Sequence, residues 1–69
     1  MEQQFNLKDE YIELHKLLKI TNLCSSGGEA KAVISDSQVI VDGQIELRKR
    51  CKIRTGQVVV YNQDTITVE

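Results

Sequence analysis

The chain has 69 residues, of which 41% are hydrophobic, and a formal net charge of −1. This length allows one domain, residues 1–69, with a small core, and the proportion of apolar residues excludes a disordered chain. No apolar run approaches the roughly 20 residues that span a bilayer, and the first residues, Met1 to Gln4, do not resemble a signal peptide. We therefore expect a cytoplasmic protein without membrane contact.

The first half of the chain predicts a short strand and a helix. Phe5 and Leu7 alternate as in a strand over residues 3–7. A helix is predicted from about Asp9 to Lys19, because its apolar residues fall three and four apart: Tyr11, Leu14, Leu17 and Leu18. His15 lies opposite this apolar stripe and is expected to be solvated. The residues after the helix, 21–23, are interpreted as a loop.

A second helix has the clearest start signal in the sequence. Ser26 and Glu29 have the spacing of a capping box, in which each side chain satisfies an unpaired backbone amide. Ala30, Val33 and Ile34 then form an apolar stripe. The helix is expected to end near residue 36 or 37.

From Val39 onward the apolar period is two, which indicates strands. Asp42-Gly43 is a strong hairpin signal, with a return strand over 44–47. Thr55-Gly56 predicts a turn, followed by strands over 58–61 and 65–68 around a turn at 62–64. The predicted fold class is α+β, with two short helices packed on one side of a small antiparallel sheet.

No pattern supports catalysis, a metal or a cofactor. His15 is the only histidine and has no specified partner, and capping explains Ser26. Gly27-Gly28 is followed by Glu29, which is not a phosphate-binding loop. Cys24 and Cys51 are expected to be reduced thiols, and the cations around Cys51 would favour its thiolate. We therefore predict neither an enzyme nor a protein with a small-molecule substrate.

The basic residues are concentrated in one segment. Five of the seven residues 48–54 are cationic: Arg48, Lys49, Arg50, Lys52 and Arg54. Such a run can neutralise backbone phosphates, and Lys31, in the first turn of the second helix, could add a further cation. Phe5, Tyr11 and Tyr61 are the only aromatic residues, which favours recognition of RNA by shape and phosphate over base stacking.

The stretch from about Leu14 to Val60 resembles the RNA-binding domain of the ribosomal protein S-four type, with its alpha-L motif. The resemblance rests on the leucine helix, Ser26-Gly27, Ala30-Lys31 and Gln38-Val39-x-Val41-Asp42-Gly43. With Arg48-Lys49-Arg50-Cys51-Lys52-Ile53, the chain is most similar to the stand-alone bacterial proteins of this type, about seventy residues long. This resemblance implies a ribosome-associated RNA-binding module whose target is structured RNA, namely ribosomal RNA or a ribosome precursor.

The resemblance also implies a site at the start of the second helix and around the hairpin that follows it. Carried over to this sequence, the RNA-binding residues are Ser26, Gly27, Lys31, Arg48, Lys49, Arg50 and Lys52. Many family members have an arginine where this chain has Gly27, so the phosphate contact is weaker at that point. The alternative interpretation is a protein-interaction module that keeps the fold without RNA binding, consistent with the net charge of −1 and the acidic first helix. Whether RNA binding needs a protein partner stays open.

Overall fold

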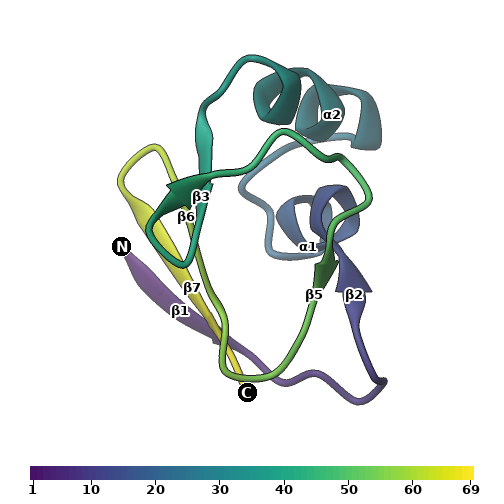
Figure 1. Ribbon diagram of the computed structural model, residues 1–69, viewed down its shortest axis with the longest axis vertical. Coiled ribbons are helices and arrows are strands. Elements are labelled where there is room, and N and C mark those ends of the chain that lie inside the picture. The colour runs from purple at the N-terminus through teal and green to yellow at the C-terminus, as the bar shows by residue number, and fades with distance from the viewer.

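The computed structural model describes all residues 1–69 and contains two helices and seven strands. The main sheet has the order β1-β7-β6-β3-β4, and β2 and β5 form a separate pair. Both helices lie on one face of the main sheet (Figure 1). The elements are β1 (Glu2–Phe5), β2 (Ile12–Glu13), α1 (Leu14–Ile20), α2 (Gly27–Ser35), β3 (Val39–Val41), β4 (Gln44–Ile45), β5 (Lys52–Ile53), β6 (Val58–Tyr61) and β7 (Asp64–Val68). The predicted α+β class, with two helices on one side of the sheet, is confirmed.

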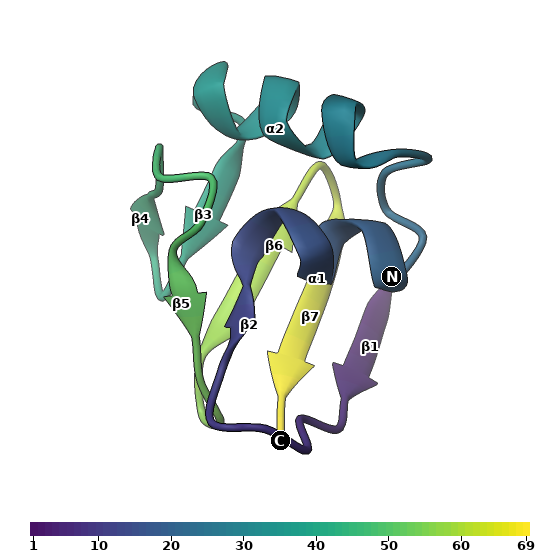
Figure 2. The same cartoon turned by 90° about the vertical axis from the view of Figure 1, so that its right-hand side faces the viewer.

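The sheet is mixed, since one of its pairings is parallel. β3, β4, β6 and β7 pair antiparallel as predicted, whereas β1 runs parallel to β7, with Phe5 opposite Val68. A parallel neighbour needs a long connection, and here nearly the whole chain separates the two strands. Figure 2 shows β1 at the sheet edge beside β7.

The predicted first helix was wrong at its start. The helix begins at Leu14, because Ile12 and Glu13 pair with Ile53 and Lys52 in the β2–β5 ribbon. Strand pairing with a distant segment therefore overrides the helical spacing of the apolar residues. Tyr11 consequently lies outside the helix and is 36% exposed.

Side-chain hydrogen bonds cap the start of α2, and left-handed residues end both helices. Ser26 caps α2 as predicted, with its hydroxyl accepting from the Glu29 N–H at 3.1 Å. The Glu29 carboxylate accepts from the Ser25 N–H at 2.6 Å and not from Ser26, so the predicted box is shifted by one residue. At the C-terminal ends, Asn22 (φ +64°) and Ser37 (φ +63°) adopt the left-handed conformation of Schellman motifs.

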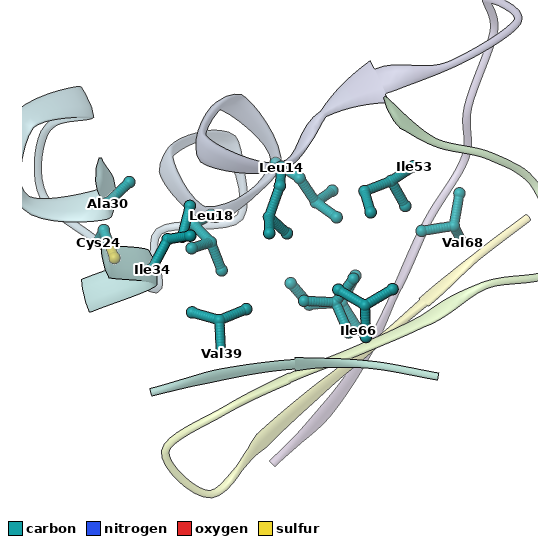
Figure 3. Close-up of a cluster of buried hydrophobic side chains, with 12 residues drawn as sticks. Leu14, Leu18, Cys24, Ala30, Ile34, Val39, Ile53, Ile66 and Val68 are labelled. Atoms are coloured by element: carbon teal, nitrogen blue, oxygen red, sulfur yellow. The ribbon is translucent and has the colours of Figure 1, made fainter. Parts of the chain in front are cut away.

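The core lies between the two helices and the main sheet (Figure 3). It contains twelve buried residues: Leu14, Leu17, Leu18, Cys24, Ala30, Ile34, Val39, Val41, Ile53, Val59, Ile66 and Val68. Leu14 and Leu18 come from α1, and Ile53 brings β5 into the same cluster. Burial of such a side chain contributes about 1.5–3 kcal/mol, so this contact fixes where the segment around β5 lies.

The hairpin at Asp42-Gly43 is confirmed, but its second strand is shorter than predicted. Asp42 (φ +50°) and Gly43 (φ +85°) have the positive φ angles of a tight two-residue turn. The Asp42 carboxylate accepts from the Val58 N–H at 2.9 Å and from the Gln57 amide at 3.0 Å. β4 ends at Ile45, and the chain leaves the sheet after Glu46, whose N–H still donates to the Val39 carbonyl at 2.9 Å.

Candidate nucleic-acid interface

The basic residues lie past the hairpin and not on it. Residues 46–51 connect β4 to β5; we call them the basic loop. Lys52 follows on β5 itself. The sequence predicts cations around the hairpin, and the structure places Arg48, Lys49 and Arg50 on the connection that follows its short second strand.

The basic loop is attached to the start of α1 through its backbone. The Leu14 N–H donates to the Cys51 carbonyl at 2.9 Å, and the His15 N–H donates to the Lys49 carbonyl at 3.1 Å. These amides belong to the first turn of α1, where N–H groups have no partner within the helix. The loop supplies the missing acceptors, so its path is tied to the core helix.

His15 adds a side-chain contact to this attachment, contrary to the predicted solvated position. His15 is only 8% exposed, and its Nδ1 lies 3.0 Å from the Lys49 carbonyl oxygen. A carbonyl oxygen only accepts, so Nδ1 carries the proton in this hydrogen bond. The prediction failed because the helix starts at Leu14, which turns position 15 toward the returning loop.

Arg48 is folded back onto the loop that carries it. Its guanidinium donates to both carboxylate oxygens of Glu46, through Nε at 2.9 Å and Nη2 at 3.1 Å. The backbone N–H of Arg48 also donates to the Glu46 carboxylate. These hydrogen bonds lower the pKa of Glu46 to about 2. The charge of Arg48 is therefore largely compensated within the protein.

Cys51 is held as a neutral thiol in the same cluster. Its Sγ lies 3.5 Å from Glu46 Oε1, to which it donates. Burial raises the pKa of the Cys51 thiol, and the nearby Glu46 carboxylate raises it further. The expected influence of the cations on this thiol is thus outweighed, because burial and Glu46 raise the pKa of Cys51 more than Arg48 lowers it. Cys24 is also a free thiol, buried in the core.

The remaining cations of the run carry no compensating acid. Lys49 and Arg50 are exposed, and no carboxylate oxygen lies within 4.0 Å of either side chain. The Nζ of Lys52, on β5, lies 5.0 Å from the centroid of the Tyr11 ring, and the Cζ of Arg54, just after β5, lies 5.7 Å from it. These four side chains place uncompensated positive charge along one segment.

The start of α2 is separate from the basic loop. In Figure 2, α2 begins above the end of α1, near β1, and its other end lies over the strands β3 and β4, beside which the basic loop rises. Ser26 and Gly27 are thus at one end of α2 and the basic loop is near the other; Lys31 lies between them, partly exposed and without an ion pair. A Cβ on Gly27 would meet no atom within 4 Å, so there is free space beside the N-terminal end of α2.

The residues that sequence reasoning missed are His15, Glu46, Tyr11 and Arg54. Arg54 lay within the basic run, yet it was left out of the site. The charge of Glu46, two residues before Arg48, could have indicated their pair. The contacts of His15 and Tyr11 depend on the β2–β5 pairing. Strands of two residues are too short to be recognised from the sequence pattern. Neither α1 nor α2 has the length and apolar character of a membrane-spanning helix.

Comparison with known proteins identifies the family of the chain. The model of the family described as S4 domain matches residues 5–69. The "Putative RNA-binding protein YbcJ" of Escherichia coli K12 is 44% identical over 61 residues, which cover 88% of this chain and 87% of that protein, and YbcJ of Shigella flexneri matches equally.

The solved structure of the same Escherichia coli protein is also similar. It superimposes with a TM-score of 0.73 and 44% identity, covering 94% of this chain and 84% of that one. That solution structure is described as revealing an αL motif involved in RNA binding. By the extent of the family match and the identity to YbcJ, this chain belongs to the S4 domain family.

Proposed function

We propose that this protein binds structured RNA and that residues 1–69 act as one RNA-binding domain. The observation that carries the proposal is the basic loop, whose exposed Lys49 and Arg50 have no acidic partner while its backbone is hydrogen-bonded to α1. Such a loop presents positive charge in one conformation, so little ordering is needed when it meets a phosphate backbone. The similarity to YbcJ supports the same function.

The proposed interface contains the seven predicted residues in distinct roles. Lys49, Arg50 and Lys52 would contact phosphates, with Lys31 as a further cation from α2. Arg48, bound to Glu46, would shape the basic loop. Ser26 and Gly27, at the N-terminal end of α2, would contact a more distant phosphate. The full set is Ser26, Gly27, Lys31, Arg48, Lys49, Arg50 and Lys52.

The finer proposal concerns the RNA itself. We propose ribosomal RNA or a ribosome precursor as the target, encountered in the cytoplasm. The exposed cationic surface suits the phosphates and 2′-hydroxyls of a folded RNA. Binding of this kind needs no cofactor and no reaction step.

A titration with labelled RNA hairpins tests the function. The protein is expected to bind a ribosomal RNA hairpin at least about ten-fold more tightly than oligo-dT of equal length, since the cations recognise folded phosphate backbone. Equal affinity for the two would contradict the proposal. A hairpin of unrelated sequence separates shape recognition from a ribosomal target. The absence of RNA binding, with binding to a protein partner that responds weakly to salt, would favour the protein-interaction alternative.

A further inference from the structure

The β2–β5 ribbon places Lys52, which belongs to the seven-residue interface, beside two side chains that this interface does not include, Tyr11 and Arg54. Ile12 pairs with Ile53, and Ile53 is buried in the core. Because alternate residues of a strand face opposite sides, Lys52 and Arg54 lie on the outer side. Tyr11 directly precedes β2 and Arg54 directly follows β5. Both cations approach the Tyr11 ring, at 5.0 Å (Lys52 Nζ) and 5.7 Å (Arg54 Cζ).

The ring orders these cations without neutralising them. Arg48 is also ordered, but by a carboxylate that compensates its charge. Lys49 and Arg50 keep their charge and have no side-chain partner. An aromatic face attracts a cation through its quadrupole and carries no net charge. Lys52 and Arg54 therefore combine a restricted position with full positive charge.

Arg54 has one further contact that supports its position. Its Nη1 donates to the Glu10 carbonyl at 3.5 Å, which leaves the other guanidinium N–H groups free. A guanidinium has five donors in a planar fork that matches phosphate oxygens. A phosphate that approaches the outer side of the ribbon would meet Arg54 and Lys52 together.

We propose that Lys52 and Arg54, held by Tyr11, form a second phosphate-binding point for the RNA backbone, with Tyr11 as a positioning residue. The interface then continues from the basic loop along β5, and Arg54 contributes more to RNA affinity than Arg48. This inference rests on the proposed function.

Five single variants test the inference with an RNA hairpin at several salt concentrations. Arg54→Ala is expected to weaken binding at least about ten-fold and to lower the log–log salt slope by about 0.9. Tyr11→Leu is expected to weaken binding about two- to five-fold, as the loss of an exposed cation–π contact predicts, with the slope unchanged because both cations remain. Tyr11→Phe keeps the ring and should bind as the natural protein does. Arg48→Ala should keep the slope.

Lys19→Ala is the matched control, since it removes an exposed cation from α1 and should leave the slope unchanged. Thermal melting checks that each variant is folded, and Arg54→Gln replaces Arg54→Ala if the alanine variant is not. Binding of the Arg54 variant equal to that of Lys19→Ala, or of Tyr11→Leu equal to Tyr11→Phe, would overturn the inference while the proposed function stands. If the natural protein binds no RNA hairpin, the proposed function fails, and this inference with it.

Discussion

The carbonyl oxygen of Lys49 accepts two hydrogen bonds from His15, one from its backbone N–H at 3.1 Å and one from Nδ1 at 3.0 Å. The two residues are 34 positions apart in sequence. His15 follows Leu14, which is fully buried, so the basic loop is attached to the first turn of a core helix. The conformation in which the loop presents Lys49 is therefore set by α1.

Replacing His15 tests this attachment. His15→Leu removes one hydrogen bond to the Lys49 carbonyl, which should cost about 1 kcal/mol of unfolding free energy and weaken RNA binding several-fold. His15→Asn is the matched variant, because an Asn amide can donate from nearly the position of Nδ1, and it should recover most of both losses. Urea denaturation and RNA titration of the two variants give the comparison. An Asn variant as impaired as the Leu variant would show that the hydrogen bond does not position the loop.

The Glu46–Arg48 pair predicts a specific pH dependence of stability. The folded-state pKa of Glu46 is about 2, against an ordinary value of 4.5. A depressed pKa stabilises the folded state fully above about pH 4.5, and this stabilisation is lost as pH falls toward 2. Glu46→Gln should therefore be less stable than the natural protein at pH 6, and the difference should shrink between pH 4.5 and 2.

The measurement is the unfolding free energy of both proteins across this range. The pKa of Asp42 is also lowered, chiefly by its hydrogen bond from Gln57. Because Asp42 is present in both proteins, its contribution cancels in the difference. A difference that stays constant from pH 6 to 2 would mean that the carboxylate of Glu46 does not contribute through its charge.

The ends of the two helices predict a stabilising substitution. Ser37 has φ +63° at the left-handed position after α2, where glycine is favoured. Ser37→Gly should raise the unfolding free energy by up to about 1 kcal/mol, by relieving this strain. Asn22→Gly, at the equivalent position after α1, should gain less, because Asn tolerates that conformation. Chemical denaturation of both variants decides the matter; an equal gain would refute this explanation.

Local signals predicted much of the fold. The Ser26 cap and the Asp42-Gly43 turn depend on neighbouring residues, and both are found where the sequence indicates. The strands after Val39 are also found, because their alternation reflects one buried face. The family resemblance added the αL arrangement, which the match over residues 5–69 confirms.

The β2–β5 ribbon could not be predicted in this way. Each of its strands has two residues, and the pairing of Ile12 with Ile53 is established only when the chain returns to α1. The same return buries His15 and brings Arg54 to Tyr11. These contacts join residues far apart in the sequence, so the periodicity of apolar residues along the chain cannot predict them. The RNA-contacting role of the seven predicted residues stays a prediction.

The most direct test of the proposed interface is the salt dependence of RNA binding by Lys49→Ala/Arg50→Ala. Lys8→Ala/Lys19→Ala is the control with the same change in net charge, made at exposed lysines outside the basic loop. Each phosphate contact contributes about 0.9 to the log–log slope on a duplex, so the first variant should bind weakly, with a slope lower by about 2. The control should keep the natural slope. If both variants show the slope of the natural protein, the basic loop makes no phosphate contacts and the proposed interface is wrong.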